Sequence, residues 1–166
     1  MRKTLLTSLA VCAAMLFAAD ARAQAPASPP PPLVYGPGLN LELARKAVTA
    51  AEAEAKKNGW FLAIAVTTNG GHLVHFSRMD GTQFASIVIA QQKAKAAATF
   101  RRPTKAFADG LAAGNTFLLT LEGVVASEGG IPLIGADGKM IGAIGCSGAT
   151  GAQDGVACQA GVNALK

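Results

Sequence analysis

The stretch WFLAIAVTTNGGHLVHFSRMDG, residues 60–81, decides the fold that the sequence predicts. Its first part, WFLAIAVT, is apolar throughout, which is typical of a strand covered on both faces. The turn Asn69-Gly70-Gly71 follows, and because these residues tolerate positive φ they predict a tight hairpin. The rest of the stretch is therefore predicted to be the returning strand of an antiparallel pair.

Helices are predicted on both sides of this hairpin. Residues 39–59 place small apolar side chains at helical spacing, with a capping residue before them and a glycine at the end. Residues 82–100 are rich in alanine and predict a second helix, which must end before Pro103. Thr104 is predicted to cap a shorter helix through Ala112.

The remainder of the chain predicts a second hairpin and a final helix. Residues 131–147 contain two apolar strands joined at Asp137-Gly138, and Thr150 opens a capping box for the last helix. Residues 115–127 fit a helix and a strand equally well and stay unassigned. Hairpins without a regular βαβ alternation predict an α+β domain. We expect an antiparallel sheet of about five strands, flanked by helices, in the order α-β-β-α-α-β-β-α.

The N-terminal residues predict export. Residues 1–23 combine a basic start, an apolar run and Ala21-Arg22-Ala23, the small-residue pattern that a signal peptidase cleaves. Residues 24–38 are rich in proline and almost uncharged, which predicts an extended linker. The folded domain is then predicted to be residues 39–166, and its predicted location is the periplasm or the exterior. No later stretch is long and apolar enough to predict a membrane span.

The charge balance does not indicate a large polyanionic partner. The formal net charge is +5, and it falls to +3 when the predicted leader, with Arg2, Lys3, Arg22 and Asp20, is removed. This excess is too small to predict binding to nucleic acid or to a membrane surface.

His72 and His75, the two histidines of the chain, lie on the predicted return strand. Strand side chains alternate between faces, which places His75 with Leu73 and His72 with Val74. The two histidines therefore cannot share one metal ion unless a bulge intervenes. A half-buried strand position explains each of them, and a lone axial ligand to haem iron is the alternative. The chain has no CxxCH motif for covalent haem attachment.

Five cations lie between residues 93 and 105 without an acid among them: Lys93, Lys95, Arg101, Arg102 and Lys105. Cations are favoured near a helix C-terminus, so a solvated helix end explains them, Lys93 and Lys95 above all. The alternative is a site for carboxylates or other anions. This alternative stays open for Arg101 and Arg102, which lie beside a helix-breaking proline.

Cys146 and Cys158 are the cysteines that remain after the leader is removed. In an oxidising compartment they could form a disulfide between the last strand and the last helix, or they could stay as two buried thiols. Both interpretations stay open. Gly142 and Gly145 in the last strand indicate a close approach to the backbone, either by a packed Ala-rich helix or by a flat ligand.

The turn after the last strand carries no motif of a hydrolase or a phosphate loop. Residues 145–149, GCSGA, depart from GxSxG at the final position, and no histidine follows them in the chain. Residues 148–153, GATGAQ, lack the Lys-Ser or Lys-Thr that a phosphate loop needs. The sequence also has no acid–base pair at a spacing that would predict catalysis.

Several blocks, taken in order, resemble a known family. Residues 71–81 resemble its GGhlvxxxRMDG block, and residues 86–97 resemble its SxxxAxxKAxxA helix. Arg102-Pro103-Thr104, residues 128–133 (EGGIPL) and residues 142–154 follow in the same order. From about residue 39 to residue 165 the chain thus resembles the GlcG/HbpS-like, or haem-degrading, family, which is related to the C-terminal domain of PduO.

The resemblance implies an antiparallel sheet flanked by helices, assembly into homo-oligomers, and haem binding in some members. The residues that match family blocks are carried over as candidate binding residues: Arg78, Thr104, Glu128, Gly129 and Gly130. The chain departs from the family pattern at Cys146, where an aliphatic residue is usual, and at Gly155, where a larger residue is usual.

Haem needs an apolar pocket, one imidazole or soft ligand, and cations for its propionates. His72, His75 and Met79 are the candidate ligands, and Arg101 and Arg102 are the candidate propionate partners. The sequence therefore favours an exported haem- or tetrapyrrole-binding protein that senses, sequesters or protects. The alternatives are an enzyme of oxidative haem degradation, a protein of small organic-acid metabolism with another small anionic ligand, and an oligomeric partner protein without a ligand.

Overall fold

The computed structural model describes residues 31–166. Within them the helices and strands are, in order, α1 (Leu41–Lys57), β1 (Ala63–Thr68), β2 (Leu73–Arg78), α2 (Ala85–Thr99), α3 (Lys105–Ala112), the 3₁₀ helix η1 (Thr116–Thr120), β3 (Gly130–Ile134), β4 (Met140–Ser147) and α4 (Gly151–Asn163). The predicted signal peptide and the first part of the predicted linker lie outside the described residues. None of the described helices has the length and apolar character that a membrane crossing needs.

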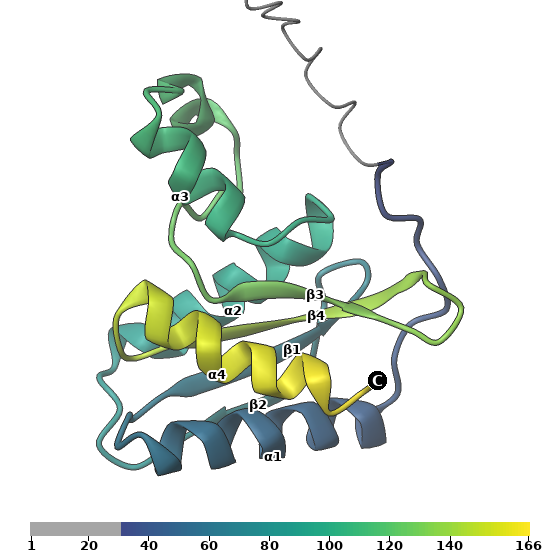
Figure 1. Cartoon of the computed structure of the whole chain (residues 1–166), viewed down its shortest axis with the longest axis vertical. Coiled ribbons are helices and arrows are strands. Elements are labelled where there is room, and N and C mark those ends of the chain that lie inside the picture. The colour runs from purple at the N-terminus through teal and green to yellow at the C-terminus, as the bar shows by residue number, and fades with distance from the viewer. Residues whose placement is uncertain (1–30) are drawn as a thin grey trace, which may run out of the picture. The chain divides into compact units, whose positions relative to one another are not determined.

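A four-stranded antiparallel sheet, in the order β2-β1-β4-β3, forms the centre of the domain. Helices α1 and α4 cover one face, and α2 covers the other (Figure 1). The predicted α+β class and order of elements are confirmed. The sheet has four strands, not about five, because the unassigned residues 115–127 form η1 and irregular backbone instead of a strand.

Strand β1 is buried on both faces, as its apolar sequence predicts. Ile64 and Val66 pack into the larger core beneath α1 and α4, whereas Ala63 and Ala65 contact α2. Because side chains alternate along the strand, the larger ones of β1 face α1 and α4 and the small ones face α2.

Small residues let α2 lie directly on the sheet. A Cβ added at Gly145 of β4 would lie 2.5 Å from the Ala94 nitrogen and closer still to the Ala90 carbonyl oxygen. The prediction that a packed Ala-rich helix approaches the strand glycines is confirmed at Gly145. At Gly142 the close neighbours are Leu39 and the backbone of β1 instead.

Strand β2 departs from simple alternation. Its register with β1 shifts where Val66 pairs with His75 and Thr67 pairs with Leu73, so Val74 is the extra residue of a bulge. The sequence predicts that Leu73 and His75 share a face, and this prediction is wrong because of the bulge. His75 lies on the face of α1 with Val66, whereas Leu73 lies on the face of α2 with Thr67.

The described end of the predicted linker packs on the domain. The Gly36 amide donates a hydrogen bond of 2.9 Å to the Met140 carbonyl oxygen. The Arg101 guanidinium donates one of 2.9 Å to the Leu33 carbonyl oxygen. Residues 33–38 are therefore held along β4 and the end of α2.

Candidate functional site

Two of the pockets in the described residues lie at opposite edges of the sheet. The first, here called the α4 pocket, has a volume of about 360 Å³ and lies between the starts of α3 and β3 and the middle of α4. Its lining residues are Pro103, Lys105, Glu128, Gly129, Gly130, Ile131, Gly155, Val156 and Gln159. The second, the hairpin pocket, has a volume of about 390 Å³ and lies between the β1–β2 turn and α2.

Glu128, Gly129 and Gly130 form one wall of the α4 pocket. The buried side chain of Thr104 holds this wall in place by hydrogen bonds. The buried Thr104 hydroxyl accepts a hydrogen bond of 2.9 Å from the Gly130 amide and donates one of 2.6 Å to the Ser127 carbonyl oxygen. Thr104 is the N-cap residue of a helix that ends at Ala112, as predicted, but its side chain makes no capping hydrogen bond because its hydroxyl is used here. Gly129 has a φ of 122°, a conformation that favours glycine.

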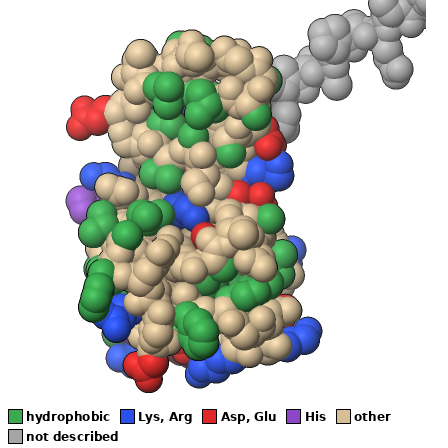
Figure 2. Space-filling view, turned by 90° about the vertical axis from the view of Figure 1, so that its left-hand side faces the viewer, with side chains coloured by type: hydrophobic (Ala, Val, Ile, Leu, Met, Phe, Trp, Pro, Cys, Tyr) green, Lys and Arg blue, Asp and Glu red, His purple; other side chains and the backbone are tan. Residues whose placement is uncertain are grey.

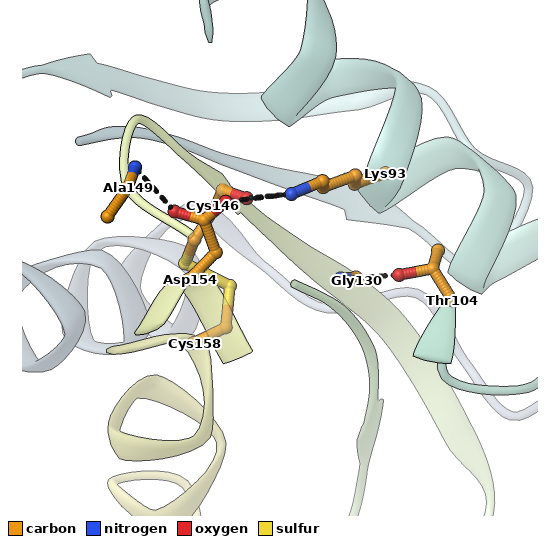
Figure 3. Close-up of a disulfide and its surroundings, with 7 residues drawn as sticks. All are labelled: Lys93, Thr104, Gly130, Cys146, Ala149, Asp154 and Cys158. Atoms are coloured by element: carbon orange, nitrogen blue, oxygen red, sulfur yellow. Dashed lines mark hydrogen bonds and ion pairs between the residues drawn. A yellow bond between two sulfur atoms is a disulfide. The ribbon is translucent and has the colours of Figure 1, made fainter. Parts of the chain in front are cut away.

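A buried ion pair that sequence reasoning missed lies behind the wall. Lys93 Nζ lies 2.8 Å from Asp154 Oδ2 and donates a hydrogen bond of 3.2 Å to the Cys146 carbonyl oxygen. The Ala149 amide donates to the other oxygen of Asp154 at 3.1 Å. Both charged side chains are 2% exposed. Figure 3 shows Lys93 pointing from α2 toward Asp154 at the start of α4, so the pair joins helices that cover opposite faces of the sheet.

The prediction that Lys93 belongs to a solvated helix end is wrong. Its neighbours at helical spacing, Ala90 and Ala97, are fully buried, and Lys93 shares their side of α2. That spacing is the signal that could have located it. Burial raises the pKa of the Asp154 carboxyl, and the nearby Lys93 ammonium opposes this effect.

Cys146 and Cys158 form a disulfide that ties β4 to α4. The sulfur atoms are 2.10 Å apart and the Cα atoms 5.8 Å apart, and both residues are fully buried. The Cys146 amide donates a hydrogen bond of 2.9 Å to the Gly129 carbonyl oxygen, and its own carbonyl accepts from Lys93. The disulfide, the ion pair and the pocket wall are therefore one connected unit (Figure 3).

The Glu128 side chain packs against α4 at Gly155. A Cβ at Gly155 would lie 2.6 Å from Glu128 Oε1, so the glycine at this position leaves room for the carboxylate. Among the described residues, Glu128 has no ion-pair partner within 4.0 Å. Its carboxylate is thus a charged group at the pocket that the fold does not use in a salt bridge.

The α4 pocket combines apolar and polar side chains. Ile131 and Val156 supply apolar surface, and Val156 is 50% exposed although its neighbours in α4 are buried. Lys105, Gln159 and Glu128 supply polar groups. This arrangement suits a ligand with an apolar body and charged substituents.

The three candidate iron ligands do not surround one pocket. His72 lines the hairpin pocket, His75 lies half-buried on the face of α1, and Met79 packs against the larger core. None of them lines the α4 pocket. Residues 31–166 also contain no group of three or more His, Cys, Asp or Glu side chains that could hold a metal ion.

The candidate arginines make contacts within the fold. Each guanidinium lies near an aromatic ring, at 5.2 Å for Arg78 and Phe84, 5.3 Å for Arg101 and Tyr35, and 5.8 Å for Arg102 and Phe107. Arg101 has a φ of 54°, an uncommon conformation for a residue with a side chain. These contacts account for the arginines without a ligand.

The fold defines a small α+β domain built on one antiparallel sheet. The chain belongs to the family described as haem degrading protein HbpS-like, whose model matches residues 39–163. It is 40% identical to Protein GlcG of Escherichia coli K12 over 109 residues, which are 66% of this chain and 81% of GlcG.

Solved structures show the same fold. A double mutant of HbpS from Streptomyces reticuli superposes with a TM-score of 0.72 at 32% identity, covering 85% of this chain and 99% of that one. A PduOC:heme complex superposes with a TM-score of 0.69 at 22% identity, covering 78% of this chain and 96% of that one. The family resemblance predicted from the ordered sequence blocks is confirmed.

Proposed function

We propose that this protein is an exported haem-binding protein and that haem binds in the α4 pocket. The observation that carries the proposal is the pocket itself, which has a volume of about 360 Å³, an apolar side and the Glu128 carboxylate, which has no ion-pair partner among residues 31–166. This volume lies at the lower end of the usual range for small-molecule sites and is smaller than a haem molecule, so the pocket would enclose only part of the ring. The family description names haem, and a relative with the same fold was crystallised with it, which supports haem over other flat ligands.

The lining residues suggest how the group would be held. Ile131 and Val156 would contact the apolar ring, and the Glu128 carboxylate is the oxygen donor available to the iron. Lys105 would pair with a propionate. Lys105 now forms an ion pair with Asp109 at 2.7 Å, but both side chains are more than half exposed, so the pair is weak and can exchange partners. Bound haem would supply a redox-active iron.

A haemin titration followed by absorbance tests this site. We expect a Soret shift that saturates at a defined stoichiometry. Val156→Glu places a charge on the apolar side, at a half-exposed position that should not disturb folding, and should abolish saturable binding. Glu128→Gln should change the spectrum or weaken binding, whereas the control His72→Ala should leave both unchanged. Loss of binding in His72→Ala alone would place haem elsewhere.

Binding can be separated from haem degradation in the same assay. For a binding protein, we expect peroxide to bleach bound haem no faster than it bleaches haem mixed with denatured protein. Faster bleaching by the folded protein would favour the enzyme alternative.

We also infer that the protein self-associates through the lobe formed by α3 and η1. Phe117 and Leu119 of η1 are 59% and 68% exposed, and Figure 2 shows hydrophobic side chains on this lobe, at the top of the view. Large exposed apolar patches mark interaction surfaces. Light scattering is expected to show an oligomer that becomes a monomer in Phe117→Ser/Leu119→Ser, with Leu41→Ser on α1 as the control. An oligomer that survives the double substitution would contradict this surface.

Export is supported by the sequence of residues 1–23 and by a disulfide that suits an oxidising compartment. Mass spectrometry of the protein from the periplasmic fraction or the medium should find Gln24 at its N-terminus. An uncleaved chain confined to the cytoplasm would refute export.

A further inference from the structure

We propose that the hairpin pocket is a second ligand site, which binds a small organic carboxylate. One wall of this pocket is the turn between β1 and β2. The other wall is formed by residues of α2 whose spacing of three or four places them on one helix face: Val88, Gln91, Gln92 and Lys95. The hairpin pocket shares no lining residue with the α4 pocket, so this proposal does not depend on haem binding.

A buried hydroxyl at this pocket lacks a partner. Thr67 lines the pocket and is 2% exposed, and its Oγ1 has no hydrogen-bond partner among residues 31–166. The next residue differs, because the Thr68 hydroxyl accepts a hydrogen bond of 3.2 Å from the His72 amide. An unpaired buried hydroxyl destabilises the folded state, and a ligand oxygen would satisfy it.

The charge of the pocket selects an anion. Lys95 is exposed and has no acidic partner within 4.0 Å in the described chain. Its alkyl stem packs on the turn, because a Cβ at Gly71 would lie 3.1 Å from Lys95 Cγ. His72 and Gln92 add nitrogen groups, and no Asp or Glu lines the pocket. This set of side chains fits a ligand that carries negative charge on hydrogen-bond acceptors.

Apolar side chains narrow the class of ligand. Leu73 and Val88 line the same pocket and are 51% and 55% exposed. They would be covered by a short aliphatic group, which an organic carboxylate has and inorganic phosphate lacks. The carboxylate would then lie toward Lys95 and Thr67, with the aliphatic part against the two apolar side chains.

Calorimetric titration of the purified protein with butyrate, butyramide and inorganic phosphate tests the proposal. Butyrate should bind saturably, whereas its neutral amide and phosphate should not. Lys95→Met keeps the alkyl stem but removes the charge, and should weaken butyrate binding by about tenfold to a hundredfold, as expected for a lost hydrogen bond to a charged group. Lys46→Met, at an exposed position of α1, is the matched control and should change nothing.

Thr67→Val distinguishes a hydroxyl that contacts the ligand from one that has only a structural role. Removing an unpaired hydroxyl should raise the unfolding midpoint of the ligand-free protein and also weaken butyrate binding. The proposal is overturned if butyrate does not bind or binds no better than butyramide or phosphate, or if Lys95→Met or Thr67→Val keeps full affinity. Haemin binding by Lys95→Met should equal that of the unmodified protein, so failure here is distinguishable from failure of the α4 site.

Discussion

Replacing Lys93 by Met is expected to lower the free energy of unfolding by about 3–5 kcal/mol, the usual cost of removing one partner from a buried ion pair. The structure gives the reason, because Lys93 and Asp154 are each 2% exposed and their charged atoms are 2.8 Å apart. Met retains most of the Lys side-chain volume, so a cavity should contribute little. The loss should therefore report the Asp154 carboxylate that is left buried without its cation.

A double-mutant cycle separates the ion pair from the effects of each substitution. Asp154→Asn keeps an oxygen that can accept from the Ala149 amide but leaves the Lys93 ammonium unpaired. In urea unfolding at neutral pH, we expect the double variant Lys93→Met/Asp154→Asn to lose about 2 kcal/mol less than the sum of the single variants. Additive losses, or a loss below about 1 kcal/mol in Lys93→Met, would refute the reasoning, since pairs that contribute so little are exposed ones.

The pH dependence of Lys93→Met follows from the same pair. Burial already raises the pKa of Asp154, and removal of the ammonium takes away the largest opposing influence. A carboxyl whose pKa is raised in the folded state stays protonated at pH values where the same carboxyl of the unfolded chain is ionised. Ionisation therefore favours the unfolded chain, and the free energy of unfolding falls as the pH rises. The stability deficit should thus be largest at neutral pH and shrink as the pH falls toward about 4. A deficit that grows on acidification would contradict this sign.

Two further variants test the packing around the sheet. Cys146→Ala/Cys158→Ala should lower the free energy of unfolding by about 3 kcal/mol, because the disulfide closes a loop with a sequence separation of 12; two titratable thiols in denatured, unreduced protein would show that the bridge is absent. Gly145→Ala should cost about 1–3 kcal/mol in thermal or urea unfolding, since the new Cβ overlaps the backbone of α2. Gly38→Ala, whose Cβ meets nothing within 4 Å, is the control, and equal losses would contradict the close approach of α2.

Strong local signals made much of the fold predictable. The apolar residues of β1 and the turn Asn69-Gly70-Gly71 identify a hairpin without knowledge of the rest of the chain. Thr150 also forms the capping box that its spacing to Gln153 predicts. Residues 115–127 lack such a signal, and the 3₁₀ helix within them packs against α3, where a Cβ at Gly110 would lie 2.8 Å from Leu118 Cδ1.

The features that sequence reasoning missed depend on contacts between distant residues. Lys93 is buried because Asp154, far along the chain, neutralises it, and single-residue tendencies place lysine in solvent. The bulge at Val74 has no turn residue to mark it. The family blocks identified Thr104 and Glu128 as candidate residues. Val156 and the other pocket residues of α4 lie beside Glu128 only because the last helix folds against it.

The most direct test of the haem site compares the unmodified protein with Val156→Glu and His72→Ala in parallel haemin titrations. The α4 pocket predicts that the unmodified protein and His72→Ala reach the same saturating Soret change, and that Val156→Glu shows only the non-saturating response of free haemin. Full, saturable binding by Val156→Glu would contradict the central claim.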